Sequence, residues 1–211
     1  MLALVAASVT SHAQTGKVET MGSLNDPVVP QPIRQALAAQ GYRIFLDDSN
    51  PVAEVWFRKS IPPQPKNAGS DAVYDRLPES TLIGVLHFTR NSNDYRGQSV
   101  PAGFYTLRYA LMPNDGDHLG VAPSRDFLLL IPASVDPGPE AAPKASEFYS
   151  LSRQASKTRH PAPLSLVPAE GRAPSGISKD DEGHSIFTTT LHLASGEEMP
   201  LALVVKGTAP Q

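Results

Sequence analysis

Proline is the residue type that most constrains how this chain can fold. The sequence of 211 residues contains 21 prolines. Each proline fixes its own φ and removes one backbone donor, so it interrupts the hydrogen-bond ladders of helices and sheets. The proline content therefore predicts many short elements joined by extended loops.

Between the prolines, the hydrophobic pattern is typical of strands. Residues 103–112 alternate strictly, which predicts a half-buried strand with one face on the core. The unbroken apolar run at 127–131 predicts a neighbouring strand covered on both faces, and residues 82–88 predict another buried strand. This central region is the clearest structural signal in the chain.

The rest of the chain adds shorter elements. Further strands are predicted at 42–46, 52–58, 163–167, 186–193 and 201–205, with loops at 61–80 and 171–183. One short helix is predicted from Pro32 to a stop at Gly41, and another from a cap at Ser146 to about Ser156. About eight strands and two minor helices predict a mainly β fold. The expected architecture is an antiparallel β-sandwich, immunoglobulin-like or jelly-roll-like, with one or two short peripheral helices.

Residues 1–13 have the pattern of an export signal. A short apolar run is followed by small residues at Ser11 and Ala13, the two positions that a signal peptidase reads, although no Lys or Arg precedes the run. We expect cleavage after Ala13, a polar leader at 14–30 and a single domain at 31–207. The protein is then secreted or periplasmic. No run approaches the roughly 20 apolar residues of a membrane-spanning helix.

The composition argues against several classes of function. A formal net charge of -3 without a basic stripe gives no reason to expect a nucleic-acid partner. The absence of cysteine rules out disulfides, thiolate metal sites and a cysteine nucleophile. The motifs of serine hydrolases, zinc proteases, phosphate-binding loops and dinucleotide-binding folds are also missing. Binding is therefore expected ahead of catalysis, and a divalent metal is the one cofactor considered.

The densest polar stretch lies at residues 114–118 (NDGDH), ahead of the strand predicted at 127–131. Its Asp-Gly pair is typical of a tight turn, which is the favoured interpretation. Asp115, Asp117 and His118 are also suitable ligands for a divalent cation. One histidine is too few for zinc, and His160 is the best distant candidate for a second one.

Three other residues are candidates for binding a ligand. Arg125 can clamp a carboxylate or phosphate group, although such an arginine more often ties down a loop. Tyr95 and Arg96 belong to a polar turn, NDYRG, and form either a simple turn or the rim of a ligand site.

Residues 98–107 read QSVPAGFYTL, a polar turn followed by Pro-Ala-Gly, an aromatic residue and an alternating strand. This segment resembles uncharacterised exported bacterial families of unknown function. The resemblance extends over residues 81–131, about a quarter of the chain. It implies an exported bacterial β-sandwich and supplies no site residues.

Three functions remain open. The first is an exported binding or accessory module for a protein or small molecule, which should show a concave apolar pocket with a few convergent polar groups. The second is a metal-assisted hydrolase or lyase centred on residues 114–118, which should place His160 beside that turn. The third is a structural envelope or extracellular subunit whose exposed edge strands pair with copies of itself.

Overall fold

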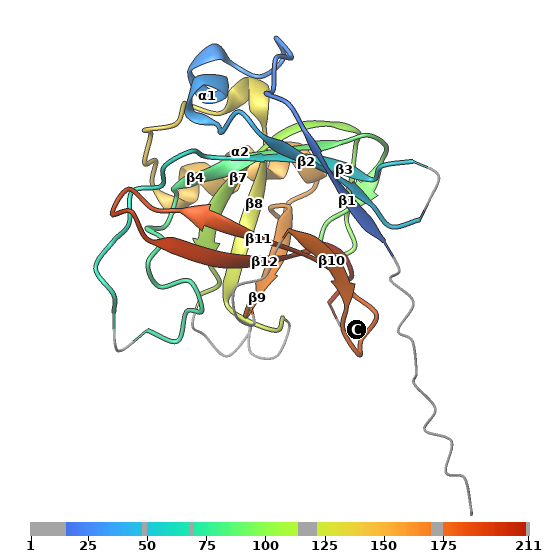
Figure 1. Cartoon of the computed structure of the whole chain (residues 1–211). Helices are drawn as coiled ribbons and strands as arrows, with labels where there is room; N and C mark the ends of the chain where they lie inside the picture. Colours follow the sequence, from blue (N-terminus) through green and yellow to red (C-terminus); the bar gives the residue numbers. More distant parts are fainter. Residues whose placement is uncertain (1–15, 48–49, 68–69, 114–121, 170–174, 210–211) are drawn as a thin grey trace, which may run out of the picture.

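The computed structural model describes residues 16–47, 50–67, 70–113, 122–169 and 175–209. Ten strands of this part form one antiparallel sheet that nearly closes into a barrel (Figure 1). The ten strands are β1 (Lys17–Met21), β2 (Gly41–Phe45), β3 (Ala53–Phe57), β4 (Leu82–Phe88), β7 (Gly103–Leu111), β8 (Asp126–Pro132), β9 (Pro163–Val167), β10 (Gly176–Lys179), β11 (Ser185–His192) and β12 (Glu198–Lys206). The remaining elements are the small hairpin of β5 (Ser92–Asn93) and β6 (Ser99–Val100), the helices α1 (Gln31–Ala36) and α2 (Ala145–Ser156), and the 3-10 helix η1 (Ala133–Val135).

The strand order is β1-β2-β3-β4-β7-β8-β9-β12-β11-β10, and every neighbouring pair is antiparallel. The mainly β fold with two short helices agrees with the sequence prediction. The observed sheet is not clearly the predicted sandwich. A sandwich consists of two packed sheets, whereas these ten strands are hydrogen-bonded in a single series. Two of the strands were missed. β1 lies in the segment interpreted as a polar leader, and β10 lies in the predicted loop at 171–183.

The interior of the curled sheet holds the main hydrophobic core. Tyr105, Leu107 and Tyr109 of β7 belong to it, as the alternation at 103–112 predicts. The opposite face of β7 was expected to be exposed, since the strand was predicted to be half-buried, and that expectation is wrong. Thr106 and Arg108 on that face are both fully buried, because the segment that follows β8 and helix α2 pack over it.

A second, smaller core lies on the outer face of β3 and β4, beneath α1. Trp56 is buried there with Ile33 of the helix, and its indole N–H donates to the carbonyl of Gly22 at 2.8 Å. Gly41 does not end the helix, which stops at Ala36. A Cβ at Gly41 would lie 2.4 Å from the Trp56 Nε1 atom, so the missing side chain makes room for the indole.

Helix α2 covers the outer face of β8. The spacing of Phe148, Leu151 and Ala155 predicts that these three side chains face inward; Phe148 and Ala155 are buried, and Leu151 is partly buried. The predicted cap at Ser146 is wrong, because the helix begins at Ala145 and Lys144 occupies the cap position without a side-chain hydrogen bond. The helix ends at Lys157, which adopts a left-handed conformation with φ 56°.

Asp126, the first residue of β8, anchors the long loop at 61–80. Its carboxylate accepts hydrogen bonds from the Tyr109 hydroxyl at 2.6 Å and from the backbone N–H groups of Val73 and Tyr74 at 2.9 Å each. Burial raises the pKa of both tyrosine hydroxyls. These hydrogen bonds tie the loop to the sheet.

Among the described residues, neither helix is long and apolar enough to cross a membrane.

Candidate functional site

A pocket of about 680 Å³ lies on the outer face of β7, β8 and β9. Its floor is apolar and consists of Ala110, Phe127 and Leu129, which the strand register places on one face of the sheet. Helix α2 contributes Tyr149 and Arg153 to the lining. The volume lies in the range of small-molecule sites, and the pattern of apolar floor and polar rim is typical of them.

Three arginines and a histidine surround this floor. Arg96, Arg153, Arg159 and His160 are all exposed and line the pocket. None of the described lining residues is acidic. The rim is therefore cationic, although the chain as a whole carries a net charge of -3.

The rim arginines differ from most others in the molecule. Within the described residues, none of the three forms an ion pair. In contrast, five arginines elsewhere each contact a carboxylate. These pairs are Arg43–Glu54, Arg58–Glu140, Arg76–Glu197, Arg108–Asp136 and Arg125–Asp71. Five of the ten described arginines are thus paired with a carboxylate, whereas the three at the rim have no such partner in the described part of the chain.

A tight turn at residues 94–98 holds Arg96 at the rim. Asp94 is fully buried, and its carboxylate accepts hydrogen bonds from the backbone N–H groups of Arg96 and Gln98 at 2.9 Å each and from the Gln98 side-chain amide at 2.6 Å. Burial raises the pKa of Asp94 to about 6, against the lowering effect of these hydrogen bonds and of the Arg96 charge. The buried carboxylate of Asp94 thus holds the 94–98 turn in its conformation.

The same turn is tied to the loop that follows α2. The Gln98 amide also donates to the carbonyl of Pro161 at 3.0 Å, and the Thr158 hydroxyl donates to the Gln98 amide oxygen. The backbone N–H of Tyr95 donates to the carbonyl of Pro163 at 2.8 Å. Arg96, Arg159 and His160 thus come from two loops that hydrogen bonds connect.

Tyr149 supplies a neutral donor on the helical side of the pocket. Burial, together with the negative charge of Glu79, raises the pKa of its hydroxyl. The ordinary pKa of a tyrosine hydroxyl is already about 10, so this group stays protonated at neutral pH. It can therefore donate a hydrogen bond to an anion that the arginines hold.

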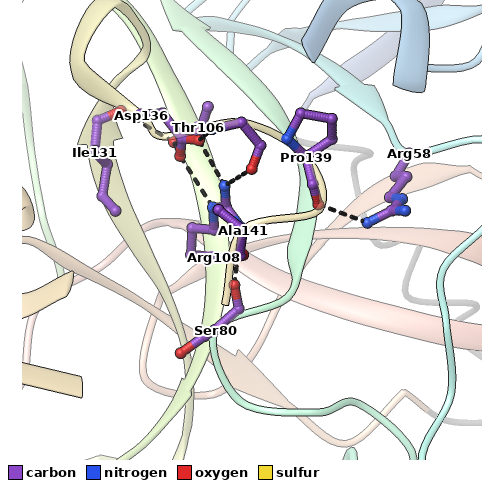
Figure 2. Close-up of polar contacts among 9 residues, drawn as sticks. Arg58, Ser80, Thr106, Arg108, Ile131, Asp136, Pro139 and Ala141 are labelled. Atoms are coloured by element: carbon purple, nitrogen blue, oxygen red, sulfur yellow. Dashed lines mark hydrogen bonds and ion pairs between the residues drawn. The ribbon is translucent and has the colours of Figure 1, made fainter. Parts of the chain in front are cut away.

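The neighbouring half of the same face is closed, and Figure 2 shows why. Arg108 donates from Nε and Nη2 to the two carboxylate oxygens of Asp136, at 2.9 and 2.5 Å. Its remaining donors reach the carbonyls of Ser80, Ala141 and Gly138. All five guanidinium donors are used inside the protein, so Arg108 holds the connection between β8 and α2 in place and has no donor left for a ligand.

The structure places the residues singled out by sequence as follows. Tyr95, Arg96 and His160 all line the pocket. Arg125 does not line it, because its guanidinium donates to the carbonyl of Met112 and pairs with Asp71. The remaining candidates, Asp115, Asp117 and His118, lie outside the described residues, so the metal site and turn predicted at 114–118 stay predictions.

Sequence reasoning missed Arg153 and Arg159. The available signal was local, since residues 152–160 (SRQASKTRH) contain three basic residues and a histidine without any acid. A basic stretch on the exposed side of a short helix looks like an ordinary solvated surface until the pocket beside it is known.

Comparisons with family models, with curated proteins and with solved structures found no match for this chain. The resemblance of residues 81–131 to exported bacterial families therefore stays a prediction. The function has to be argued from the geometry of the pocket.

Proposed function

We propose that this protein is a binding module, and that the pocket between α2 and the outer face of β7–β9 takes a small ligand with an apolar body and an anionic head group. The observation that carries this proposal is the combination of an apolar floor with three rim arginines that lack carboxylate partners in the described part of the chain. The binding role was one of three expected from the sequence. The export predicted from residues 1–13 is a separate proposal.

The chemistry of the two zones supports this ligand class. Ala110, Phe127 and Leu129 offer a surface that gains from covering by an apolar chain or ring, at roughly 25 cal/mol per Å² buried. Guanidinium groups bind carboxylates, phosphates and sulfates through paired, charge-assisted hydrogen bonds. A cationic or fully apolar ligand would leave this rim without a partner.

The first experiment compares three amphiphiles with the same chain length. Isothermal titration calorimetry of the full chain measures binding of dodecanoate, dodecanol and dodecyltrimethylammonium below their micelle-forming concentrations. We expect dodecanoate to bind with a Kd in the micromolar range, and the other two to bind at least about tenfold more weakly, since each lost charge-assisted hydrogen bond costs about 1.5 kcal/mol.

Variants of the rim test the role of the arginines directly. Arg153→Gln and Arg159→Gln should each weaken dodecanoate binding about five- to tenfold. Arg90→Gln is the matched control, because Arg90 is exposed, has no ion pair within the described residues and lines a different pocket. Equal binding of all three amphiphiles, or an equal loss in the Arg90 variant, would contradict the proposal.

A further inference from the structure

The turn between β10 and β11 brings one imidazole and two carboxylates together. His184 is 5% exposed, and its Nδ1 atom lies 2.8 Å from Asp180 Oδ2 and 3.4 Å from Glu182 Oε2. The three groups form the one His/Asp/Glu cluster of this kind among the described residues. Glu182 and His184 border a second pocket, of about 650 Å³, which is distinct from the arginine-rimmed one.

Both ring nitrogens of His184 face oxygen atoms that accept hydrogen bonds. While Nδ1 faces the two carboxylates, Nε2 lies 3.4 Å from the carbonyl oxygen of Thr208. A neutral imidazole has one N–H and one lone pair, so one of its nitrogens would direct a lone pair at an acceptor. A metal ion on Nδ1 would resolve this conflict, and so would a second proton.

Thr208 orients the ring as a metal-ligating histidine is oriented. Histidine ligands usually donate their other ring N–H to a carbonyl or carboxylate, which fixes the tautomer and turns the free nitrogen toward the ion. Here the carbonyl of Thr208 is placed to accept from Nε2. A close backbone approach maintains this, since a Cβ at Gly207 would lie 2.2 Å from His184 Cδ2.

Tyr95 provides an independent observation at the same place. Its ring lies 5.7 Å from the His184 ring, centroid to centroid. The residue is 3% exposed, and its hydroxyl has no hydrogen-bond partner among the described residues. Burial raises the pKa of this hydroxyl, and the charges of Glu182 and Asp180 raise it further. A buried polar atom without a partner, on a ring that packs against His184, indicates that something else completes this cluster.

We propose that Asp180, Glu182 and His184 form a binding site for a first-row divalent transition-metal ion such as Zn²⁺. Nitrogen and oxygen ligands held about 2.1 Å from a tetrahedral zinc ion lie about 3.4 Å apart. The Nδ1–Glu182 Oε2 distance already matches this spacing, and all three ligand atoms lie within 4.8 Å of one another, whereas Asp180 Oδ2, at 2.8 Å from Nδ1, would have to move outward by about 0.6 Å to admit the ion. A mixed imidazole and carboxylate set binds Zn²⁺ in preference to Ca²⁺ or Mg²⁺, which favour oxygen ligands. The adjoining pocket gives the ion access to solvent. This site does not depend on the ligand proposed above.

Calorimetric titration of Zn²⁺ into the EDTA-treated, dialysed full chain tests the site. We expect one ion to bind with a Kd of about 10 µM or lower, and Glu182→Gln to weaken binding at least about tenfold. Asp181→Asn is the matched control. Both residues are exposed members of the same turn, both changes remove one negative charge, and Asp181 lies outside the cluster.

Nitrogen-15 NMR of the His184 side chain distinguishes the metal from the second proton. With Zn²⁺ bound, Nδ1 should take the chemical shift of a metal-ligated nitrogen while Nε2 remains protonated. If both nitrogens stay protonated at saturating Zn²⁺, the cluster is an ion pair and the proposal is wrong. Absence of binding, or equal weakening by Glu182→Gln and Asp181→Asn, would also overturn it.

Discussion

Arg108 and Ala110 lie two residues apart on the outer face of β7, yet the surface above them differs completely. Above Arg108, the connection between β8 and α2 closes over the sheet, with the Phe148 ring 5.3 Å from the guanidinium carbon. Above Ala110 the same face stays open as the floor of a pocket. We call these regions the closed half and the open half.

Each half contains a buried aspartate and an arginine, but only in the closed half does the arginine side chain donate hydrogen bonds to the aspartate. In the closed half, Asp136 takes two hydrogen bonds from Arg108 and one from the Thr106 hydroxyl. In the open half, the hydrogen bonds to Asp94 come from uncharged donors, and the Arg96 side chain stays exposed. The difference separates an arginine that bonds within the fold from one whose side chain stays exposed at the rim of the proposed ligand pocket.

The largest expected effect is in the closed half. Arg108→Met leaves Asp136 as a buried charge without its partner, so we expect the free energy of unfolding to fall by about 3–5 kcal/mol in urea titrations. The double variant Arg108→Met/Asp136→Leu should recover part of this loss, since it removes the stranded charge. A loss below about 1 kcal/mol would mean that Arg108 does not hold this half together.

The next effect concerns the buried carboxyl of the open half. The pKa of Asp94 is about 6 in the folded protein, above the ordinary 3.8, so the folded state binds this proton more tightly. The stability that it contributes is fully present below pH 3.8 and is lost as the pH rises through about 6. Asp94→Asn should remove this slope. Relative to wild type, the variant should therefore gain on the order of 1–3 kcal/mol between pH 4 and pH 7.

Urea titrations of both proteins at several pH values measure that difference. Asp75→Asn serves as a control, because Asp75 lies outside the 94–98 turn and should keep the wild-type slope across this pH range. A wild-type slope in the Asp94 variant would show that another group titrates there.

The smallest expected effect on stability is that of replacing a rim arginine in the open half. Arg153→Gln in the open half should change the free energy of unfolding by no more than about 0.5 kcal/mol, because its exposed side chain makes no ion pair with the described residues. Arg108→Gln is the same substitution in the closed half, and thermal unfolding should show a much larger loss. Similar losses in the two variants would remove the distinction between structural and ligand-binding arginines.

Local patterns in the sequence predicted most of the strands. The alternation at 103–112 and the apolar run at 127–131 became the adjacent strands β7 and β8, because the period of apolar side chains along a strand is a local property of the sequence. The single curled sheet was not predictable in this way. β1 and β10, which form its two ends, are short and largely polar, and their place depends on pairing with β2 and β11.

The candidate site was partly predictable for a similar reason. Tyr95, Arg96 and His160 were singled out separately as polar residues near turns, and the fold brings them to one pocket. The burial of Arg108 could not be predicted, since it depends on Asp136, 28 residues further along the chain. Sequence patterning shows that a strand has two faces, but long-range packing decides whether a face is covered.

The two ends of the sheet meet without being joined. β1 and β10 approach each other and are not hydrogen-bonded neighbours, and Gly16 lies directly against Ile177 at this seam. A fully closed barrel has no edge, whereas this sheet keeps two edges that lie close together without pairing as strands. Amide hydrogens beside the seam should therefore exchange with deuterium earlier than those of β7 and β8, which have partners on both sides. In mechanical terms the protein is a rolled sheet with one unpaired seam, and we expect local opening to begin between β1 and β10.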